Sequence, residues 1–418
     1  MRLQTILNRV EKYKSFVYGR DRLEEADHGP VVVIEVRSRK NSQPICSGCG
    51  CRGPVKDRLD ERRFEYVPLW GLAVYFAYRL RRVACPKCGA TVEQVPWCDG
   101  KHSLTTTYRW FLAKWAQRLS WTEVATIFGS TWDHVHRSVQ HAVTWGLLHR
   151  VLTGVKSLGI DEVAWRKGHK YLTLVYDITV GGEKRLLAVE EHREEASLRK
   201  CLARLGGAVC GQVEYVCSDM WRPYLTVIQE KLSQAVHVLD RFHIMQGFGK
   251  AIDEVRAEEQ KQLQRDGYEP VLTKSRWCLL KRPANLTSRQ TVKLAELLKY
   301  NLRSVRAYLL REEFQRFWTY VSPAWAGKFL DEWTSRVLRS RLEPMKRVAR
   351  TLRNHRDLIL NWFRAKGEMS SGVVEGLNNK VKLVTRKSYG FRTLDVAKLA
   401  LLHNLGRLPE PEDTHRFC

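Results

Sequence analysis

The alternation of hydrophobic and polar positions divides the chain into segments of strand character and segments of helical character. Between residues 155 and 243 it predicts three strands, a helix, a strand, a second helix and a last strand. The predicted strands are residues 155–160, 171–180, 184–189, 213–219 and 235–239, and the helices are residues 194–205 and 223–231. Gly181 and Gly182 form a hairpin-turn signal between the second and third strands. An antiparallel trio followed by strands that are separated by helices predicts a mixed α/β sheet.

Helical periodicity dominates two other parts of the chain. In the first, Ser120 and Glu123 form a capping-box pair, Gly129 ends a short helix, and Ser130 or Thr131 can cap the next one. A helix, a glycine turn and a second helix predict a helix-turn-helix, although two plain packing helices would give the same pattern. The side chains that we expect to face a DNA major groove are His134, His136, Arg137 and Gln140.

The second helical part runs from about residue 247 to residue 366. Apolar residues recur there at three- and four-residue steps, as at Leu298, Leu302 and Val305, and prolines punctuate the helices. Lysine and arginine are dense, so the faces that do not form the core are basic, and these faces either follow DNA or are simply solvated. We interpret this part as an all-helical insertion.

Four of the 11 cysteines form two CxxC motifs, each followed by glycine. Four thiolates satisfy a tetrahedral zinc ion, and the small residues let backbone amides approach the sulfurs. The residues between the motifs include two strand-like runs, 63–70 and 73–83, with Gly71 at the turn, and such a hairpin is typical of a zinc ribbon. Cys51 lies close enough to the first motif to compete with it as a ligand. The predicted ligands of one structural Zn²⁺ are Cys46, Cys49, Cys85 and Cys88.

The charge balance indicates the class of partner. Lysine and arginine number 71 against 45 acidic residues, which gives a formal net charge of +26 and a pI near 9.8. Such a surplus is typical of proteins that bind nucleic acid, and an inert basic surface or an anionic membrane surface is the alternative. No run approaches the roughly 18 apolar residues of a membrane span, and the N-terminal residues lack a signal-peptide core. We therefore expect a cytoplasmic, nucleoid-associated protein with reduced cysteines.

Two acidic residues stand at the ends of predicted strands, and a third lies on a later helix. Asp161 follows the first strand, Asp219 follows the fourth, and Glu375 occurs in the helical segment Val-Val-Glu-Gly-Leu-Asn-Asn-Lys. The strand order matches the ribonuclease-H-like fold, in which carboxylates from the first and fourth strands lie side by side. Three such carboxylates can hold two Mg²⁺ or Mn²⁺ ions, roughly 4 Å apart, which clamp the attacking and leaving oxygens of a phosphodiester.

The helix of Glu375 carries further polar residues at helical spacing. Asn379 and Lys382 stand four and seven positions after Glu375, so the three share one face. This face combines a carboxylate for metal, an amide to orient it and a lysine for phosphate. A basic segment with a tyrosine and a phenylalanine follows. The expected DNA contacts of this part are Asn379, Lys382, Arg386, Lys387 and Arg392.

Other polar residues near the three acids have structural interpretations. Glu162 should point to the opposite face of the sheet from Asp161, and we expect it to be structural. Asp177 is an outside candidate for supporting the site. Asp240 and His243 either border the metal ions or form a structural hydrogen bond. Trp221 could stack on a base, but in a chain with 14 tryptophans we expect plain packing.

In their order along the chain, these motifs resemble the ISL-three insertion-sequence transposases, a bacterial family of the DDE group. The resemblance covers about residues 46 to 405 and includes the two CxxC motifs and the helix-turn-helix pattern. The later shared motifs are Gly-Ile-Asp161-Glu, Ser-Asp219-Met-Trp-Arg-Pro-Tyr224, Val-Leu-Asp240-Arg-Phe-His243, Val-Glu375-Gly-Leu-Asn-Asn-Lys380 and Thr385-Arg-Lys-Ser-Tyr-Gly-Phe-Arg392. The resemblance implies an enzyme that recognises terminal inverted repeats, cleaves their ends and joins them to target DNA, with Asp161, Asp219 and Glu375 as the metal-binding triad.

The predicted architecture is a multidomain α+β protein. The expected parts are an N-terminal segment with a zinc ribbon (1–103), a helix-turn-helix DNA-binding domain (104–150), a ribonuclease-H-like catalytic domain in two pieces (151–246 and 369–418) and an all-helical insertion (247–368). One metal ion would activate water or a terminal 3′-hydroxyl, and the other would stabilise the departing 3′-oxygen. The expected partner is double-stranded DNA, and the pairing of two ends implies a homodimer or a larger assembly.

Three alternatives remain compatible with the sequence. A DNA-binding regulator would keep the zinc and helix-turn-helix modules without chemistry, although it would be expected to lose an acidic triad that is intact here. A ribonuclease-H-like nuclease or resolvase would cut DNA without joining it. An inactive copy of a transposase would also retain these motifs.

Overall fold

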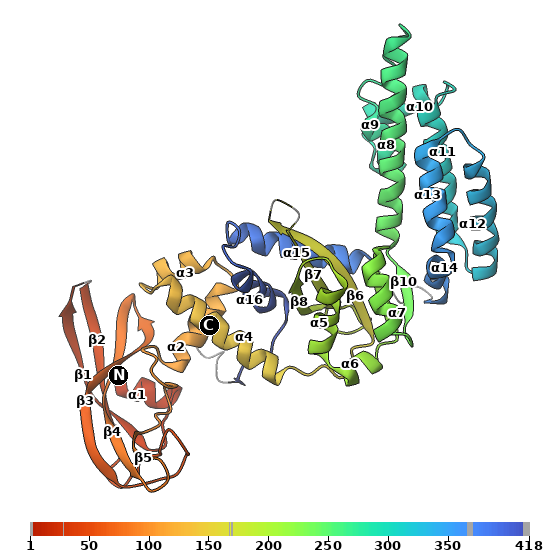
Figure 1. Cartoon of the computed structure of the whole chain (residues 1–418). Helices are drawn as coiled ribbons and strands as arrows, with labels where there is room; N and C mark the ends of the chain where they lie inside the picture. The colour runs from red at the N-terminus through yellow and green to blue at the C-terminus, as the bar shows by residue number, and fades with distance from the viewer. Residues whose placement is uncertain (1–2, 28, 167, 169, 366–370, 413–418) are drawn as a thin grey trace. The chain divides into compact units, whose positions relative to one another are not determined.

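The computed structural model describes residues 3–27, 29–166, 168, 170–365 and 371–412. It forms two compact units, which Figure 1 shows in one colour gradient along the chain and which are described separately below. The first unit is made of Met1–Val151 and Val384–Cys418, and the second is Leu152–Leu383. Within the described ranges, none of the helices combines the length and the apolar character that a membrane crossing requires. The predicted mixture of helices and sheets is confirmed.

The first unit contains a five-stranded sheet that follows helix α1 (Leu3–Val10). Its strands are β1 (Phe16–Ala26), β2 (Gly29–Ser38), β3 (Val55–Leu69), β4 (Leu72–Cys85) and β5 (Gly89–Val92). The order is β1-β2-β4-β3, with β5 paired to β4, and only β2 and β4 pair in parallel. The predicted hairpin is confirmed and is longer than expected, and its turn uses the positive φ angles of Trp70 (52°) and Gly71 (81°). Two strands of this sheet, β1 and β2, come from the segment before the first CxxC motif.

Trp97 anchors the core of this sheet. Its side chain is almost fully buried and meets the rings of Phe16, Phe64 and Tyr78 edge-on, at centroid distances of 4.9, 6.0 and 5.3 Å. Burial of a large apolar side chain stabilises a fold by about 1.5–3 kcal/mol, and edge-to-face contacts add to this. The cluster therefore joins the first strand to the hairpin that carries the cysteines.

Three helices follow in the same unit: α2 (Thr106–Ala116), α3 (Trp121–Ile127) and α4 (Trp132–His149). The predicted capping box is present, because the Ser120 hydroxyl accepts from the Glu123 amide while the Glu123 carboxylate accepts from the Ser120 amide. Gly129 makes the turn with a φ of 62°, and the Thr131 side chain caps α4 by accepting from the His134 amide. The expected helix, turn and helix are thus observed with the expected caps.

The second unit begins with a mixed sheet. It contains β6 (Ser157–Arg166), β7 (Lys170–Asp177), β8 (Arg185–Glu191), α5 (Glu195–Leu205), α6 (Gly207–Gly211), β9 (Tyr215–Ser218), α7 (Arg222–Lys231) and β10 (Val236–Leu239). The strand order is β10-β9-β6-β7-β8, in which β6, β7 and β8 are antiparallel to one another and β9 and β10 run parallel to β6. One face of the sheet packs on α5 and α7, through residues that include Ile160, Val175, Leu198 and Val227. The predicted strands and their antiparallel trio are confirmed.

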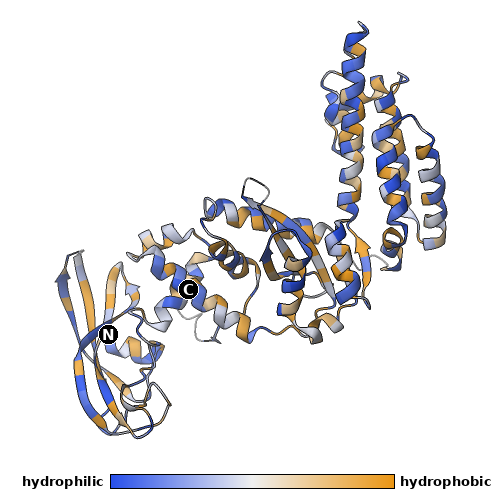
Figure 2. Ribbon diagram, viewed as in Figure 1, coloured by the Kyte–Doolittle hydropathy of each residue, from blue (hydrophilic) through white to orange (hydrophobic). Residues whose placement is uncertain are grey.

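A helical region follows β10. Its helices are α8 (Arg241–Arg265), α9 (Arg276–Leu280), α10 (Ser288–Leu297), α11 (Arg303–Gln315), α12 (Pro323–Leu338), α13 (Glu343–Asn354) and α14 (Arg356–Arg364). Phe248, Phe314 and Trp333 pack together at its centre, and hydrophobic and hydrophilic bands alternate along the helices in Figure 2. The helical region starts at Arg241 rather than near residue 247, because Asp240 caps α8 directly after the strand.

Helix α15 (Ser371–Lys387) links the two units, and α16 (Leu394–Leu405) follows it. Residues from Val384 onward group with the first unit, in which α16 packs on α4. Sequence reasoning had assigned all of 369–418 to the catalytic domain. In the structure, the boundary between the two units falls inside α15, between Leu383 and Val384. The segment after this boundary packs on the first unit, as where Leu408 lies close to Gly146.

Candidate active site and metal centres

Asp161 and Asp219 lie on adjacent strands of the second unit, Asp161 in the middle of β6 and Asp219 directly after the end of β9. The expected strand end at Asp161 is wrong, because β6 continues to pair with β7 beyond it, as far as Arg166. Asp161 is on β6 and only 6% exposed, and Asp219 follows the last residue of β9, which pairs in parallel with β6. The Asp161 carboxylate accepts two hydrogen bonds, one at Oδ1 from the amide of Glu162 (2.8 Å) and one at Oδ2 from the side-chain amide of Asn378 (2.6 Å). The Asp219 Oδ1 accepts from the amide of Trp221 at 3.0 Å. Both carboxylates are therefore buried and held in fixed orientations.

Burial governs the electrostatics of these two carboxylates. Desolvation raises the pKa of Asp161, and the nearby charge of His243 opposes this. Desolvation also raises the pKa of Asp219, opposed by the Trp221 amide and by the charges of His243 and Arg193. The Asp161 and Asp219 charges repel each other. A site with two buried acids of raised pKa gains stability from an added cation, as a metal-binding site would.

His243 supplies positive charge beside the two acids. Its Nδ1 lies 3.0 Å from Oδ2 of Asp240, and this hydrogen bond, with the charges of Asp161, Asp240 and Asp219, raises the pKa of His243 to about 9. The imidazole is therefore protonated at neutral pH in the metal-free chain. The sequence left two roles open for this pair, and the structure contains both a structural hydrogen bond and a position beside the acids.

Arg193 connects Glu162 to Asp219. One guanidinium nitrogen lies 3.0 Å from the Glu162 carboxylate and another lies 3.7 Å from Asp219 Oδ2, while the guanidinium carbon stands 4.0 Å from the ring centroid of Trp221. Burial raises the pKa of Glu162 to about 7, and the Asp219 charge contributes. Sequence reasoning treated Glu162 as structural and missed Arg193, because a basic residue after a strand carries no signal of its own in a chain with 71 of them.

Asp177, an outside candidate, serves the β7–β8 turn. Its Oδ1 accepts from the amide of Thr179 at 3.1 Å, and its Oδ2 lies 3.5 Å from Arg185. These contacts are local to the turn and give the carboxylate a structural role.

Helix α15 brings a different amide to Asp161 from the one expected. Val374 packs where a Cβ at Gly159 would lie, and Asn378 reaches Asp161, whereas Glu375 and Asn379 are exposed. Lys382 is exposed as well, so the three residues with the predicted spacing do share an exposed face. The repeated asparagine in the Glu375 motif was the one available signal for Asn378, and spacing alone favoured its neighbour.

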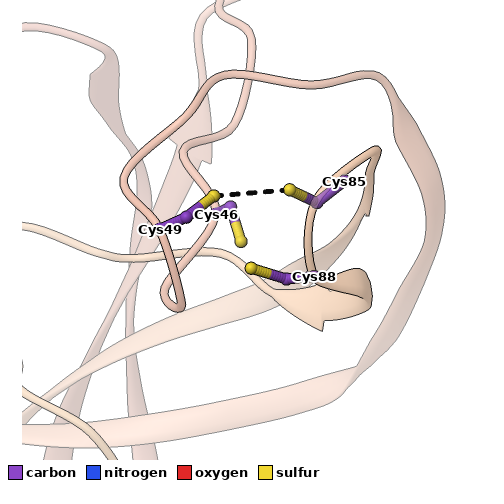
Figure 3. A group of neighbouring side chains, drawn as sticks. All are labelled: Cys46, Cys49, Cys85 and Cys88. Atoms are coloured by element: carbon purple, nitrogen blue, oxygen red, sulfur yellow. Dashed lines mark hydrogen bonds between the residues drawn. The ribbon is translucent and has the colours of Figure 1, made fainter.

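Four cysteines of the first unit converge (Figure 3). The Sγ atoms of Cys46, Cys49, Cys85 and Cys88 all lie within 4.8 Å of one another, and those of Cys49 and Cys85 are 3.4 Å apart. Four sulfurs about 2.3 Å from a tetrahedral zinc ion would be separated by roughly 3.8 Å, so the cluster fits such an ion. Cys51 uses its backbone carbonyl, which accepts from the amide of Cys46, and its thiol is outside the cluster.

The environment of Cys46 favours its thiolate. The Thr91 hydroxyl lies 3.0 Å from the Cys46 sulfur, and this contact, with backbone amides of the first CxxC motif, lowers the pKa of Cys46 to about 6. Thiolates are the form that binds metal. Within the described ranges, these four cysteines are the only group of three or more possible metal ligands whose ligand atoms all lie within 4.8 Å of one another. The carboxylates of Asp161, Asp219 and Glu375 therefore do not form so close a group.

The residues predicted to face a DNA groove occupy the first half of α4. Arg137 and Gln140 are exposed, whereas His136 stacks on Trp132 with a centroid distance of 5.1 Å and an interplanar angle of 9°. His134 is partly buried, and this burial lowers its pKa. Arg137 and Gln140 are thus the two accessible side chains of the predicted set.

The basic residues at the end of α15 differ in environment. Lys387 is partly buried, and its ammonium donates to the carbonyls of Gln117 (2.9 Å) and Ala116 (3.3 Å). A lysine that donates to the last carbonyls of a helix stabilises that helix end, here the end of α2. Arg386 and Arg392 are exposed.

The amino-acid sequence is similar to those of known transposases. A transposase family model, DDE_Tnp_ISL3, matches residues 158–401, which is more than half of the 418-residue chain. The transposase for insertion sequence element IS1001 of Bordetella parapertussis is 28% identical over 379 residues, which span 90% of this chain and 92% of that protein. The transposase for insertion sequence element IS1557 of Mycobacterium tuberculosis (strain CDC 1551 / Oshkosh) is 27% identical over 427 residues, which span 94% of this chain and 93% of that protein.

Proposed function

The chain belongs to the ISL-three family of transposases, and on this premise we propose that it cuts the ends of an insertion sequence and joins them to target DNA. The observation that carries the proposal is the pair Asp161 and Asp219, one buried carboxylate within β6 and one directly after the adjacent parallel strand β9, with the helix of Glu375 attached to Asp161 through Asn378. We assign the sheet of the second unit to a ribonuclease-H-like catalytic domain and α8–α14 to a helical insertion within it.

The chemistry of the donor set favours divalent magnesium or manganese. Asp161, Asp219 and Glu375 offer hard carboxylate oxygens, and the first two are buried acids of raised pKa that a cation would stabilise. Both oxygens of Asp161 and Oδ1 of Asp219 each accept one hydrogen bond. Each of these oxygens keeps a second lone pair that could bind a metal ion. Glu375 stands one turn before Asn378, so a change of its side-chain rotamer, with DNA or metal bound, would direct it to the same site.

Two such ions would activate the attacking oxygen of water or a 3′-hydroxyl and stabilise the departing 3′-oxygen. Other residues of the chain orient the carboxylates that would hold the ions and offset their negative charge. Asn378 orients Asp161, and the amide of Trp221 orients Asp219. His243 and Arg193 offset negative charge beside the carboxylates before the substrate arrives. No covalent link between protein and DNA is needed, because hydrolysis and strand joining are both in-line displacements at phosphorus.

We assign DNA recognition to the first unit. The cysteine cluster would hold one structural zinc ion as part of a zinc ribbon, and α2–α4 would form a helix-turn-helix whose accessible side chains include Arg137 and Gln140. The double-stranded terminal repeats and target DNA are the proposed partners, and a net charge of +26 supports a polyanionic partner. Pairing two ends would take a dimer or a larger assembly.

The remaining proposed DNA contacts are basic or amide side chains of α15 and the segment after it. Asn379, Lys382, Arg386 and Arg392 are exposed, as phosphate contacts must be. Lys387 was predicted in the same set, but its hydrogen bonds to α2 favour a structural role. His134 and His136 are similarly engaged within the helical region and rank below Arg137 and Gln140 as contacts.

The test is an end-cleavage and joining assay. Labelled DNA that carries the sequences flanking the gene is incubated with the protein and Mg²⁺, with Asp219→Ala as the control. Nicking at the repeat boundary followed by joining to a second DNA, absent in the control, supports a transposase. Nicking without joining supports a nuclease, and tight binding without nicking in either protein supports a regulator or an inactive copy.

A further inference from the structure

A groove of about 520 Å³ opens beside Asp219 in the second unit. Its lining includes Arg193, Asp219 and Trp221, together with residues of α8, among them His243, and of α13; these two helices lie next to each other (Figure 1). Its volume falls in the range of ligand pockets, roughly 300–1,000 Å³. The groove therefore joins the proposed cleavage site to the helical insertion.

Trp221 is the aromatic side chain of this groove, and it is 38% exposed. One face of its indole carries the Arg193 guanidinium at 4.0 Å, and its Nε1 donates to the backbone carbonyl of Arg193 at 3.2 Å. These contacts hold the ring in one orientation and leave part of its apolar surface in water. Plain packing, which the sequence favoured for Trp221, would instead cover the ring. An oriented, exposed aromatic ring with an adjacent guanidinium is the chemistry on which nucleobases stack.

The helices that line the groove offer cations for a phosphate. Lys250 on α8 is exposed, and within the described part of the chain it forms no ion pair. Arg347 on α13 is paired with Glu254 at 2.5 Å, so its charge is balanced and Lys250 carries the free charge. An aromatic ring and an unpaired ammonium that line the same groove suit the base and the phosphate of a nucleotide.

We propose that this groove binds one unpaired nucleotide of the DNA strand next to the scissile phosphate, with its base stacked on Trp221 and its phosphate near Lys250. The inference rests on the proposed function for the position of the nucleotide relative to Asp219. It adds that the DNA is locally unpaired when it is cut, since a base inside a duplex cannot reach the ring.

Photocrosslinking tests the contact without relying on cleavage. A 12-nucleotide single-stranded DNA with one 5-iodouracil is irradiated with the protein in Ca²⁺, and the crosslinked peptide is identified by mass spectrometry. We expect the peptide that contains Trp221. We also expect Trp221→Ala to weaken binding of this DNA about 5- to 150-fold, the range for loss of one base–aromatic stack. Crosslinks that map elsewhere, with unchanged affinity in Trp221→Ala, would overturn the proposal.

Two matched variants separate stacking from folding. Trp277→Ala removes another exposed tryptophan of the second unit, which has Arg276 at 5.2 Å but lies outside the groove, and it should leave crosslinking and affinity unchanged. Trp221→Phe keeps a ring without the indole N–H and should retain most of the affinity. If Trp221→Phe is as weak as Trp221→Ala, the indole acts through its hydrogen bond to Arg193, and the stacking proposal is wrong.

The same variants in the end-cleavage assay separate the two proposals. Trp221→Ala should cleave fully paired ends more slowly than wild type, and a mismatch beside the scissile phosphate should restore part of the rate. Crosslinking at Trp221 in a protein that never cleaves would overturn the proposed function while supporting the nucleotide site. Normal cleavage by Trp221→Ala on paired ends would overturn the nucleotide site while supporting the proposed function.

Discussion

The side-chain amide of Asn378 donates to Oδ2 of Asp161 at 2.6 Å, although the two residues are 217 positions apart in the chain. The Tyr176 hydroxyl donates to the amide oxygen of Asn378 at 2.8 Å, which fixes the direction in which the amide points. Two strands and α15 are therefore joined at one carboxylate. Glu375, the proposed third acid, is one turn away from Asn378 on the same helix.

Asn378→Ala should impair metal use more than folding. Partners that orient a metal ligand change affinity or activity by about 10- to 100-fold when they are removed, so we expect the Mg²⁺ concentration for half-maximal cleavage to rise by that factor. The measurement is the cleavage rate against Mg²⁺ concentration. Asn379→Ala, at the exposed neighbouring position, is the control and should leave the Mg²⁺ dependence unchanged. Equal effects of the two variants would contradict the role given to Asn378.

The charge of His243 should stabilise the protein in a pH-dependent way when Mg²⁺ and Mn²⁺ are absent. Its pKa is raised from 6.5 to about 9 in the folded chain, so its contribution is complete below about pH 6.5 and is lost as the pH rises through 9. The melting temperature of wild type should therefore exceed that of His243→Gln at pH 6.5, and the difference should shrink by pH 9.5. Asp240→Asn removes the hydrogen bond that is the largest cause of the raised His243 pKa. In that background, the difference in melting temperature between His243 and His243→Gln proteins should depend much less on pH. A difference that is constant with pH would show that His243 does not carry this charge.

Zinc content should distinguish the cysteines of the cluster from their neighbour. Cys46→Ser removes a proposed zinc ligand, so we expect this variant to bind less zinc than wild type and its first unit to lose stability, because metal binding contributes to folding. Cys51→Ser changes a thiol outside the cluster and should keep the zinc. Metal analysis of both purified variants gives the answer. Zinc retained by Cys46→Ser would remove Cys46 from the ligand set.

The sequence predicted the local elements of this protein well. The strand end at Asp219, the caps at Ser120 and Thr131, and the hairpin between the cysteine motifs all depend on short-range patterns of polarity, turn residues and metal-ligand spacing. The strand that carries Asp161 was predicted to end there but continues to Arg166. Such patterns are visible in one chain because the residues that specify each element are close together in sequence.

Long-range contacts could not be predicted in the same way. The contacts of Arg193 with Asp219 and of Asn378 with Asp161 depend on how β8 and α15 pack beside these acids. No sequence spacing predicts such a partner for an arginine or an asparagine. The helical region began earlier than expected because Asp240 serves as its cap, and the segment from Val384 joined the first unit through packing that no periodicity encodes. The roles of Glu375 and of the DNA contacts stay predictions.

The most direct test of the account compares isosteric variants of the proposed triad in single-turnover cleavage of end DNA with Mg²⁺. Asp161→Asn, Asp219→Asn and Glu375→Gln keep side-chain shape and remove the charges that bind metal, so each should cut on the order of 10³-fold more slowly, the equivalent of several kcal/mol in the barrier. DNA binding should stay within a few-fold of wild type, and Asp177→Asn, which alters a buried carboxylate of the β7–β8 turn, should cleave within a few-fold of the wild-type rate. Cleavage by Glu375→Gln at the wild-type rate would contradict a three-carboxylate centre, and equal loss of binding and cleavage in all three variants would contradict a catalytic role.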